Sequence, residues 1–209
     1  MLFILVLFVI AILSYLIGSI NCSILISRIF KKDVRESGSG NAGATNMLRT
    51  FGPLAGVVTM VGDFLKTLIP LVITRVIFRQ EEYWQAIVAF SGFFCSMGHA
   101  FPVYFGFRGG KAVTVVAMVL LVVDWRCFAV AVTVFVLTVL LTKFVSLGSM
   151  LGGFSGAVTM LFICQDDLAN RWFVSICLFA LVVMVVFLHW ENVKRLVRGT
   201  ERKFKFKKD

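Results

Sequence analysis

Seven apolar runs constrain this sequence more than any other feature. They lie at about residues 2–27, 53–78, 84–102, 110–124, 127–142, 147–163 and 171–189. A helix of about 20 apolar residues crosses the hydrocarbon core of a bilayer. Only 15% of the 209 residues are charged, whereas soluble proteins contain about a quarter. The sequence therefore predicts an all-α transmembrane bundle of about seven spans, forming a single domain over residues 1–209.

Two features leave the span count open. The fourth and fifth runs meet at residues 124–126, and reading them as one broken helix gives six spans. The second run is long and contains charged and helix-breaking residues, so it can also be two shorter helices with a break in the bilayer. These residues are Gly62, Asp63, Lys66 and Pro70. No lysine or arginine precedes Arg28, so we expect the first run to stay as an anchor rather than be cleaved.

The distribution of the 21 basic residues predicts the orientation. With the N-terminus outside, sixteen fall on one side: Arg28, Lys31, Lys32, Arg35, Arg49, Arg108, Lys111, Lys143 and eight after Trp190. Only Arg79, Arg126 and Arg171 fall on the other side, apart from Arg75 and Lys66 within the second run. By the positive-inside rule, the sixteen-residue side and the C-terminus are cytoplasmic. The net charge of +10 then points to anionic lipid rather than to nucleic acid.

The polar stretch from Glu36 to Arg49 is the first candidate site. Its glycines let the backbone approach a ligand closely, and its side chains supply neutral donors and a planar cation; these are Ser37, Ser39, Asn41, Thr45, Asn46 and Arg49. A helix beginning at Ala44 would add the positive potential of its N-terminus. The stretch is typical of a phosphate cradle, although it is equally consistent with a polar loop between two spans.

A second glycine-rich segment runs from Gly98 to Lys111. It is not a nucleotide P-loop, because Phe105 stands where the first glycine is required and Ala112 replaces the Ser or Thr. The remaining Arg-Gly-Gly-Lys turn, residues 108–111, indicates a second anion cradle at the start of the fourth run, with positive-inside charge at a simple turn as the alternative.

The predicted topology brings four polar segments to one membrane face. They are residues 36–52, 98–114, 143–149 and 189–203, and two of them carry the only histidines, His99 and His189. His189, Asn192 and Arg195 are spaced to share one face of a continuing helix. This convergence favours an anionic-substrate site at the cytoplasmic interface.

The other patterns favour structural roles. Asp63 and Lys66 are spaced to form an ion pair at a helix break. The five cysteines, including Cys164, are scattered singly and read as packing residues, and Gly148, Gly152 and Gly156 indicate helix packing. No metal-ligand spacing occurs, so we expect neither a metal nor a cofactor. The basic tail, about residues 194–209, suits contact with anionic headgroups, or is simply disordered.

Three motifs resemble the signatures of the bacterial acyl-phosphate-dependent glycerol-3-phosphate acyltransferases. They read Ser39-Gly-Asn-Ala-Gly-Ala-Thr-Asn-x-x-Arg49, Gly98-His-x-Phe-Pro-Val-x-x-x-Phe-Arg-Gly-Gly-Lys111 and His189-x-x-Asn-x-x-Arg-Leu-x-x-Gly-x-Glu201. Arg108 stands where the family often has Lys, Ala112 where it often has Gly, and Thr67 where a Gly is common. The resemblance spans nearly the whole chain and implies seven helices with the N-terminus outside.

The resemblance also implies an activity, transfer of a fatty acyl group from acyl phosphate to the 1-hydroxyl of glycerol 3-phosphate. The implied catalytic residues are Ser39, Lys111, His189 and Asn192. The implied substrate-binding residues are Asn41, Gly43, Thr45, Asn46, Arg49, His99, Arg108, Gly109, Gly110, Ser146 and Arg195, with Ser149 as the alternative to Ser146. In this picture the backbone amides of the 109–111 turn help to clamp the phosphates, and the hydroxyl proton passes to His189 or to a substrate phosphate.

The same resemblance implies a bacterial inner-membrane enzyme with its active site on the cytoplasmic face. Its partners would be membrane lipids and, transiently, the soluble enzyme that supplies acyl phosphate, and a monomer is expected. Two other classes remain open. A transporter of phosphorylated solutes would place polar residues on both sides of the membrane, and a non-enzymatic adaptor would leave the two glycine-rich segments unexplained.

Overall fold

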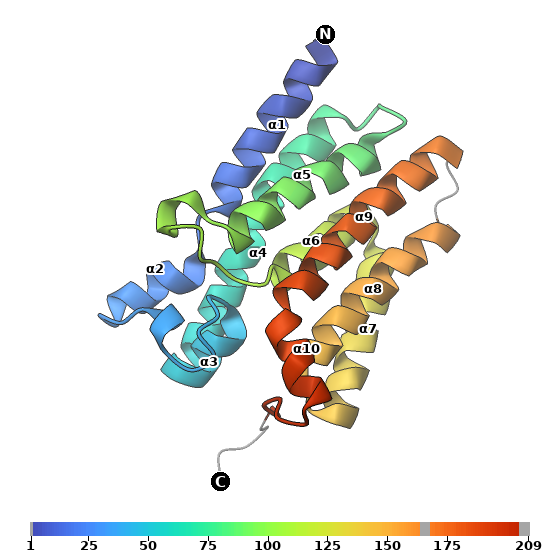
Figure 1. Ribbon diagram of the computed structural model, residues 1–209. Helices are drawn as coiled ribbons and strands as arrows, with labels where there is room; N and C mark the ends of the chain where they lie inside the picture. Colours follow the sequence, from blue (N-terminus) through green and yellow to red (C-terminus); the bar gives the residue numbers. More distant parts are fainter. Residues whose placement is uncertain (1, 164–167, 205–209) are drawn as a thin grey trace. The chain divides into compact units, whose positions relative to one another are not determined.

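The computed structural model describes residues 2–163 and 168–204 (Figure 1). Every regular element in these ranges is a helix, so the all-α prediction is confirmed. The chain divides into two compact units, residues 1–119 and 120–209, and a single domain stays a prediction. Cys164, the acidic pair Asp166 and Asp167, and residues 205–209 of the basic tail lie outside the described ranges.

The first unit is built from five α-helices, two short 3-10 helices and most of a sixth α-helix. The elements are α1 (Leu2–Gly18), α2 (Cys22–Ile29), η1 (Val34–Glu36), α3 (Ala44–Phe51), α4 (Pro53–Ile77), α5 (Trp84–Ala100), η2 (Val103–Phe105) and α6 (Val113–Val123), which runs into the second unit. Helices α1, α4 and α5 pack on one another, and α3 packs on α4. Figure 1 shows α1 beside α5.

The second unit contains α7 (Trp125–Thr142), α8 (Val145–Ile163), α9 (Leu168–Leu188) and α10 (Trp190–Val197). Helix α8 packs on α7 and on α9. The predicted packing role of the α8 glycines is confirmed, because a Cβ on Gly152 would lie 2.7 Å from the carbonyl oxygen of Ala131 on α7. The neighbouring Gly148 and Gly156 are similarly close to α7.

Six helical segments among the described residues are long and apolar enough to cross a membrane. They correspond to the predicted runs except the fourth, because α6 has only 11 residues. A span needs about 17 to 25 residues, so the count of seven and the orientation of the termini stay predictions.

The structure corrects where the helix break lies. The second run is one continuous helix, α4, although it contains Pro70. The first run is broken instead: α1 ends at Gly18 and α2 begins after Asn21, whose side-chain oxygen accepts a hydrogen bond from the amide of Ile24. Asparagine side chains stabilise such a helix start, and Gly18, Ser19 and Asn21 interrupt the apolar pattern at this point.

Large apolar side chains mostly face outward, while small and polar residues fill the contacts between helices. On α1, Leu2 and Ile4 are more than 70% exposed, whereas Ser14 is buried and bonded to Ser91 of α5 at 2.9 Å between the two hydroxyl oxygens. This pattern is expected where lipid covers the surface, since helices in a membrane associate by close backbone packing and polar contacts.

The closest approach of α1 and α5 occurs at Gly18, where an added Cβ would lie 2.1 Å from the carbonyl oxygen of Cys95. Overpacking of this kind costs about 1–3 kcal/mol, so Gly18→Ala should lower the thermal unfolding temperature of the detergent-purified protein. Gly153→Ala on α8 is the control, because nothing lies within 4 Å of its added Cβ. Equal stability of the two variants would contradict this packing.

Candidate functional site

The first glycine-rich loop is held together by the side chain of Asn46. Its oxygen accepts a hydrogen bond from the amide of Ser39 at 2.9 Å, and its nitrogen donates to the carbonyl oxygens of Val34 and Ser37 at 3.0 and 2.9 Å. Gly38 has a φ of 63° and lies so close that a Cβ would meet the Asn46 oxygen. Asn46, predicted to bind substrate, is buried and uses both ends of its amide to shape the loop.

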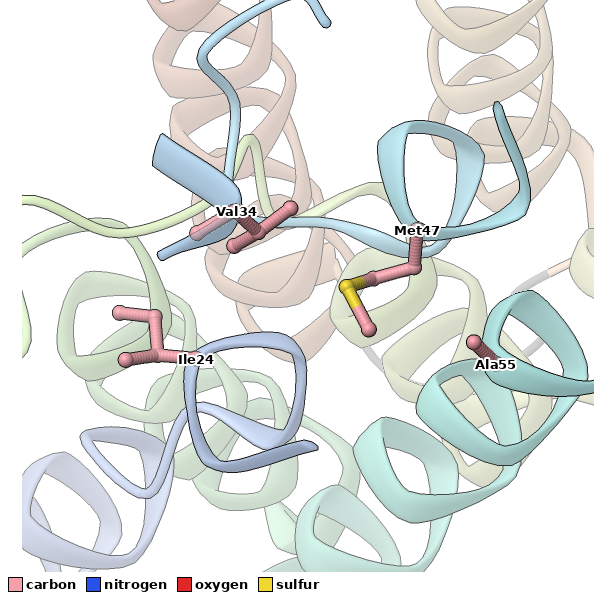
Figure 2. Close-up of a cluster of buried hydrophobic side chains, with 5 residues drawn as sticks. Ile24, Val34, Met47 and Ala55 are labelled. Carbon is pink, nitrogen blue, oxygen red and sulfur yellow. The ribbon is translucent and has the colours of Figure 1, made fainter. Parts of the chain in front are cut away.

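Beneath this loop lies a small hydrophobic cluster, drawn in Figure 2. Ile24 of α2, Val34 of η1, Met47 of α3 and Ala55 of α4 are 0 to 5% exposed and join Ala42 of the loop itself. The cluster anchors both ends of the loop, which therefore has a defined conformation despite its glycines.

The predicted helix start at Ala44 is confirmed as the beginning of α3. Its N-cap, Gly43, has no side chain with which to occupy the first backbone N–H groups, so these can meet an anion. Ser39, Thr45 and Arg49 are exposed, and Thr45 and Arg49 lie one turn apart on α3. The loop thus offers hydroxyls, an amide from Asn41 and a guanidinium to an anionic ligand.

The second glycine-rich segment forms a tight turn against the end of α5. The amide of Gly109 donates to the carbonyl oxygen of Ala100 at 3.0 Å, and that of Gly110 to His99 at 3.1 Å. These amides, which the sequence predicts to clamp a phosphate, complete the end of α5 in the structure. The turn instead presents the side chains of Arg108, which is exposed, and Lys111, which is half-buried.

Arg35 joins the two loops. Its guanidinium donates to the carbonyl oxygens of Phe105 at 2.7 Å and Arg108 at 3.3 Å, while its other nitrogens bind Asp33. Hydrogen bonding to Arg35 lowers the pKa of the Asp33 carboxyl, which outweighs the opposing effect of partial burial. Sequence reasoning missed this residue, because nothing near Asp33 and Arg35 in the sequence points to residues 105–108.

Lys66 of α4 confirms the predicted ion pair, with 3.0 Å between its Nζ and Oδ1 of Asp63. It also donates to the carbonyl oxygens of Gly18 at 3.1 Å and Ile20 at 2.7 Å, at the break between α1 and α2. The fourth neighbour of Nζ is Nδ1 of His99 at 2.9 Å. His99, predicted to bind substrate, is 2% exposed and lies between this ion pair and the glycine turn.

In the second unit, Glu201 binds polar side chains from α8 and α10. Its carboxylate accepts hydrogen bonds from Ser146 Oγ at 2.6 Å, Asn192 Nδ2 at 2.6 Å and Arg195 Nε at 2.7 Å. Ser149 instead donates to the carbonyl oxygen of Val145 within its own helix, which supports the choice of Ser146. Glu201 stands in the third motif, yet nothing in the sequence around it predicts this role.

His189 lies at the junction of α9 and α10, and its Nδ1 is 2.8 Å from the carbonyl oxygen of Val185. A carbonyl only accepts, so Nδ1 carries the hydrogen, and in the neutral ring Nε2 then carries a lone pair. Asn192 and Arg195 follow on α10 and both reach Glu201, so the predicted common helix face is confirmed for these two.

The structure thus brings the four predicted segments together in two pairs. In the first unit, segment 36–52 lies beside 98–114, since a Cβ on Gly110 would be 2.5 Å from the carbonyl oxygen of Ala42. In the second unit, segment 143–149 contacts 189–203 through the hydrogen bond from Ser146 to Glu201. The convergence of all four segments on one membrane face stays a prediction. In the described ranges no group of three or more His, Cys, Asp or Glu side chains is arranged to hold a metal ion.

Comparison with known proteins gives a consistent result over nearly the whole chain. Residues 8–199 match the family model described as glycerol-3-phosphate acyltransferase. The chain is 40% identical to glycerol-3-phosphate acyltransferase 2 of Bacillus anthracis, covering 92% of this chain and 96% of that one. It is 37% identical to the glycerol-3-phosphate acyltransferase of Listeria monocytogenes serovar 1/2a, covering 96% and 98%.

Two solved structures share the fold. Both are of PlsY, described as an integral membrane glycerol 3-phosphate acyltransferase, and both are 32% identical to this chain. The glycerol 3-phosphate form has a TM-score of 0.84 and covers 95% of this chain and 96% of its own. The lysophosphatidic acid form has a TM-score of 0.82, with 95% of each chain covered.

The Glu201 cluster predicts a pH dependence of stability. Burial alone raises the pKa of Glu201, but the hydrogen bonds from Ser146, Asn192 and Arg195 together outweigh it and lower the pKa. The stabilisation is therefore present above the ordinary glutamate value of about 4.3 and is lost as the pH falls through the lower folded value. Thermal unfolding followed down to about pH 3 should show this loss in the wild type, and less of it in Glu201→Gln, which cannot titrate.

Glu191→Gln is the matched control for this experiment. Glu191 is exposed and forms an ion pair with Lys194, three residues later on α10, at 2.9 Å. Exposed pairs of this kind contribute little, so this variant should follow the wild-type curve. If Glu191→Gln and Glu201→Gln flatten the curve equally, the Glu201 cluster is not the source of the acid sensitivity.

Proposed function

Because this chain belongs to the glycerol-3-phosphate acyltransferase family, we propose that it uses acyl phosphate as the acyl donor. The products would be 1-acylglycerol 3-phosphate and inorganic phosphate. The chain is an integral membrane glycerol-3-phosphate acyltransferase of the PlsY type, and its activity serves phospholipid biosynthesis. The observation that carries the donor assignment is the joining of two cationic, glycine-rich loops by Arg35 in one unit.

Two loops suit a reaction in which both substrates carry a phosphate. We assign Ser39, Asn41, Thr45, Arg49 and the start of α3 to one phosphate, and Arg108 and Lys111 to the other. Gly43, Gly109 and Gly110 serve by letting the backbone turn and approach closely. Two phosphates held near each other repel, and the cations offset this repulsion.

The reaction then requires that the two substrates be positioned, more than that the acyl group be activated. An acyl phosphate is a mixed anhydride, so the 1-hydroxyl oxygen of glycerol 3-phosphate can attack the carbonyl carbon directly. The bond from this carbon to the phosphate oxygen breaks, and phosphate leaves with the electron pair. We assign the hydroxyl proton to Nε2 of His189, because its Nδ1 is hydrogen-bonded to Val185.

Asn192 and its neighbours would orient the attacking hydroxyl. Glu201 holds the Asn192 amide nitrogen, which fixes the direction of its side-chain oxygen, and it also holds Ser146 and Arg195. We propose that Ser39 and Lys111 complete the catalytic set by binding the phosphate oxygens that gain charge as the bond breaks.

We propose that the enzyme works as a monomer on the cytoplasmic face of a bacterial inner membrane. The sixteen cytoplasmic cations of the predicted topology support this orientation. Acyl phosphate would reach the enzyme from a soluble partner that makes it. The outward-facing apolar side chains of the helices provide a lipid-facing surface along which an acyl chain can lie.

The test is phosphate release by the detergent-purified protein given palmitoyl phosphate. We expect release only when glycerol 3-phosphate is also present, and a loss of about 100-fold or more in Lys111→Ala, since such electrostatic contacts are worth about 10²–10³ in rate. Arg79→Ala is the control, because Arg79 is exposed and lies outside both loops.

A parallel reaction with palmitoyl-CoA separates the donors. Acyl transfer from the thioester but not from palmitoyl phosphate would refute the acyl-phosphate assignment. Binding of glycerol 3-phosphate without turnover of either donor would instead favour a transport or adaptor role.

A further inference from the structure

The ammonium group of Lys66, which is 6% exposed, makes three hydrogen bonds, one for each of its hydrogens. They go to the carbonyl oxygens of Gly18 and Ile20 and to Nδ1 of His99 at 2.9 Å, while Oδ1 of Asp63 lies 3.0 Å away as the ion-pair partner. An ammonium group only donates, so Nδ1 presents its lone pair to Lys66. The hydrogen of the neutral ring is then on Nε2, the opposite arrangement from that in His189.

The Nε2 side of the same ring lies where the two glycine-rich loops meet. A Cβ added to Gly110 would be 2.2 Å from His99 Nε2 and 2.5 Å from the carbonyl oxygen of Ala42 in the first loop. The backbone of His99 also accepts the amide of Gly110 at 3.1 Å. One buried ring therefore contacts the second loop directly and lies beside the first.

We propose that His99 is a positioning residue that sets the spacing of the two anion-binding loops. The Asp63–Lys66 pair fixes its tautomer and orientation, and the ring in turn supports Gly110 against Ala42. His99 acts through these backbone atoms and does not touch substrate, since it is 2% exposed. The inference rests on the proposed role of the loops as phosphate sites.

This assignment accounts for a charged pair inside an apolar helix. Ionisable side chains within a membrane span are costly, so they persist where they serve a function. Asp63 offsets the charge of Lys66, while Lys66 donates hydrogen bonds to the last carbonyl oxygen of α1 and to His99. The pair thus links the break in the first span to the geometry of the loops.

The first test is the tautomer itself. The chain has only two histidines, so protein labelled with ¹⁵N at histidine gives two ring systems, which His99→Asn assigns. We expect His99 to be protonated on Nε2 and His189 on Nδ1. Lys66→Met should turn the His99 signal into a mixture of tautomers. A hydrogen on Nδ1 of His99 in the wild type would overturn the proposal.

The second test separates binding from chemistry. His99→Asn keeps an oxygen that can accept from Lys66 but removes the ring atoms that support Gly110. We expect near wild-type thermal stability, a KM for at least one substrate raised about tenfold, and a kcat within about twofold, because displaced loops weaken ground-state binding. Ser96→Ala, one turn earlier on α5 and also buried, should change neither constant.

A double-mutant cycle shows whether His99 acts through Gly110. Gly110→Ala should raise the same KM, since its Cβ would clash with the ring, and the double variant should be no worse than Gly110→Ala alone. The positioning role would be refuted if the increases in KM of the two single variants multiplied in the double variant, or if KM were unchanged in His99→Asn.

Calorimetric binding of glycerol 3-phosphate without an acyl donor keeps the two proposals apart. Weaker binding in His99→Asn, together with a failure of the wild type to use palmitoyl phosphate, would remove only the donor assignment. Unchanged binding and unchanged KM values in an enzyme that does use palmitoyl phosphate would remove only the positioning role.

Discussion

The first unit depends on the contacts that the ammonium group of Lys66 makes. By binding the carbonyl oxygens of Gly18 and Ile20, this group lets α1 end inside an apolar stretch, where an unpaired carbonyl would be costly. That break redirects the chain into α2 and so toward the first loop. The same atom binds His99, next to the second loop. A single charge, balanced by Asp63, thereby couples the helix packing to the place where anions are expected to bind.

In both glycine-rich loops, many of the hydrogen-bonding groups bond to other atoms of the protein. Asn46 is committed to the backbone of residues 34–39, and the amides of Gly109 and Gly110 are committed to the end of α5. These hydrogen bonds define the conformation of both loops although the loops are rich in glycine. In the proposed function, recognition of an anion then falls to the exposed side chains and to the start of α3. Such preorganisation favours catalysis, because the donors need not be reorganised when charge develops.

The sequence was sufficient for the features that hydropathy and spacing determine. The long apolar runs became helices, and α3 began at Ala44 as the glycines before it predicted. The break after Gly18 was missed although Gly18 and Asn21 are typical of a helix end and a helix start, because the long apolar stretches on both sides were read as one span. The roles of Asn46 and Arg35 were also out of reach, since they depend on which backbone atoms the fold brings near. The alternative of a break in the second run, which rested on Gly62, Asp63, Lys66 and Pro70, was wrong, because a proline is tolerated inside a membrane helix.

The two histidines show why the candidate site needed three-dimensional information. Both lie at the end of an apolar helix, both stand in a motif with basic residues, and both are buried. Neither the sequence nor the exposed fraction of the side chain therefore distinguishes them. The atom that faces Nδ1 separates them: an ammonium group in His99 and a carbonyl oxygen in His189. The first makes the ring a hydrogen-bond acceptor toward the helices, with its remaining hydrogen directed at the loops. The second leaves a basic nitrogen at Nε2, which a proton acceptor requires. In the roles proposed for them, the partner of one ring nitrogen therefore decides which histidine positions the loops and which accepts a proton.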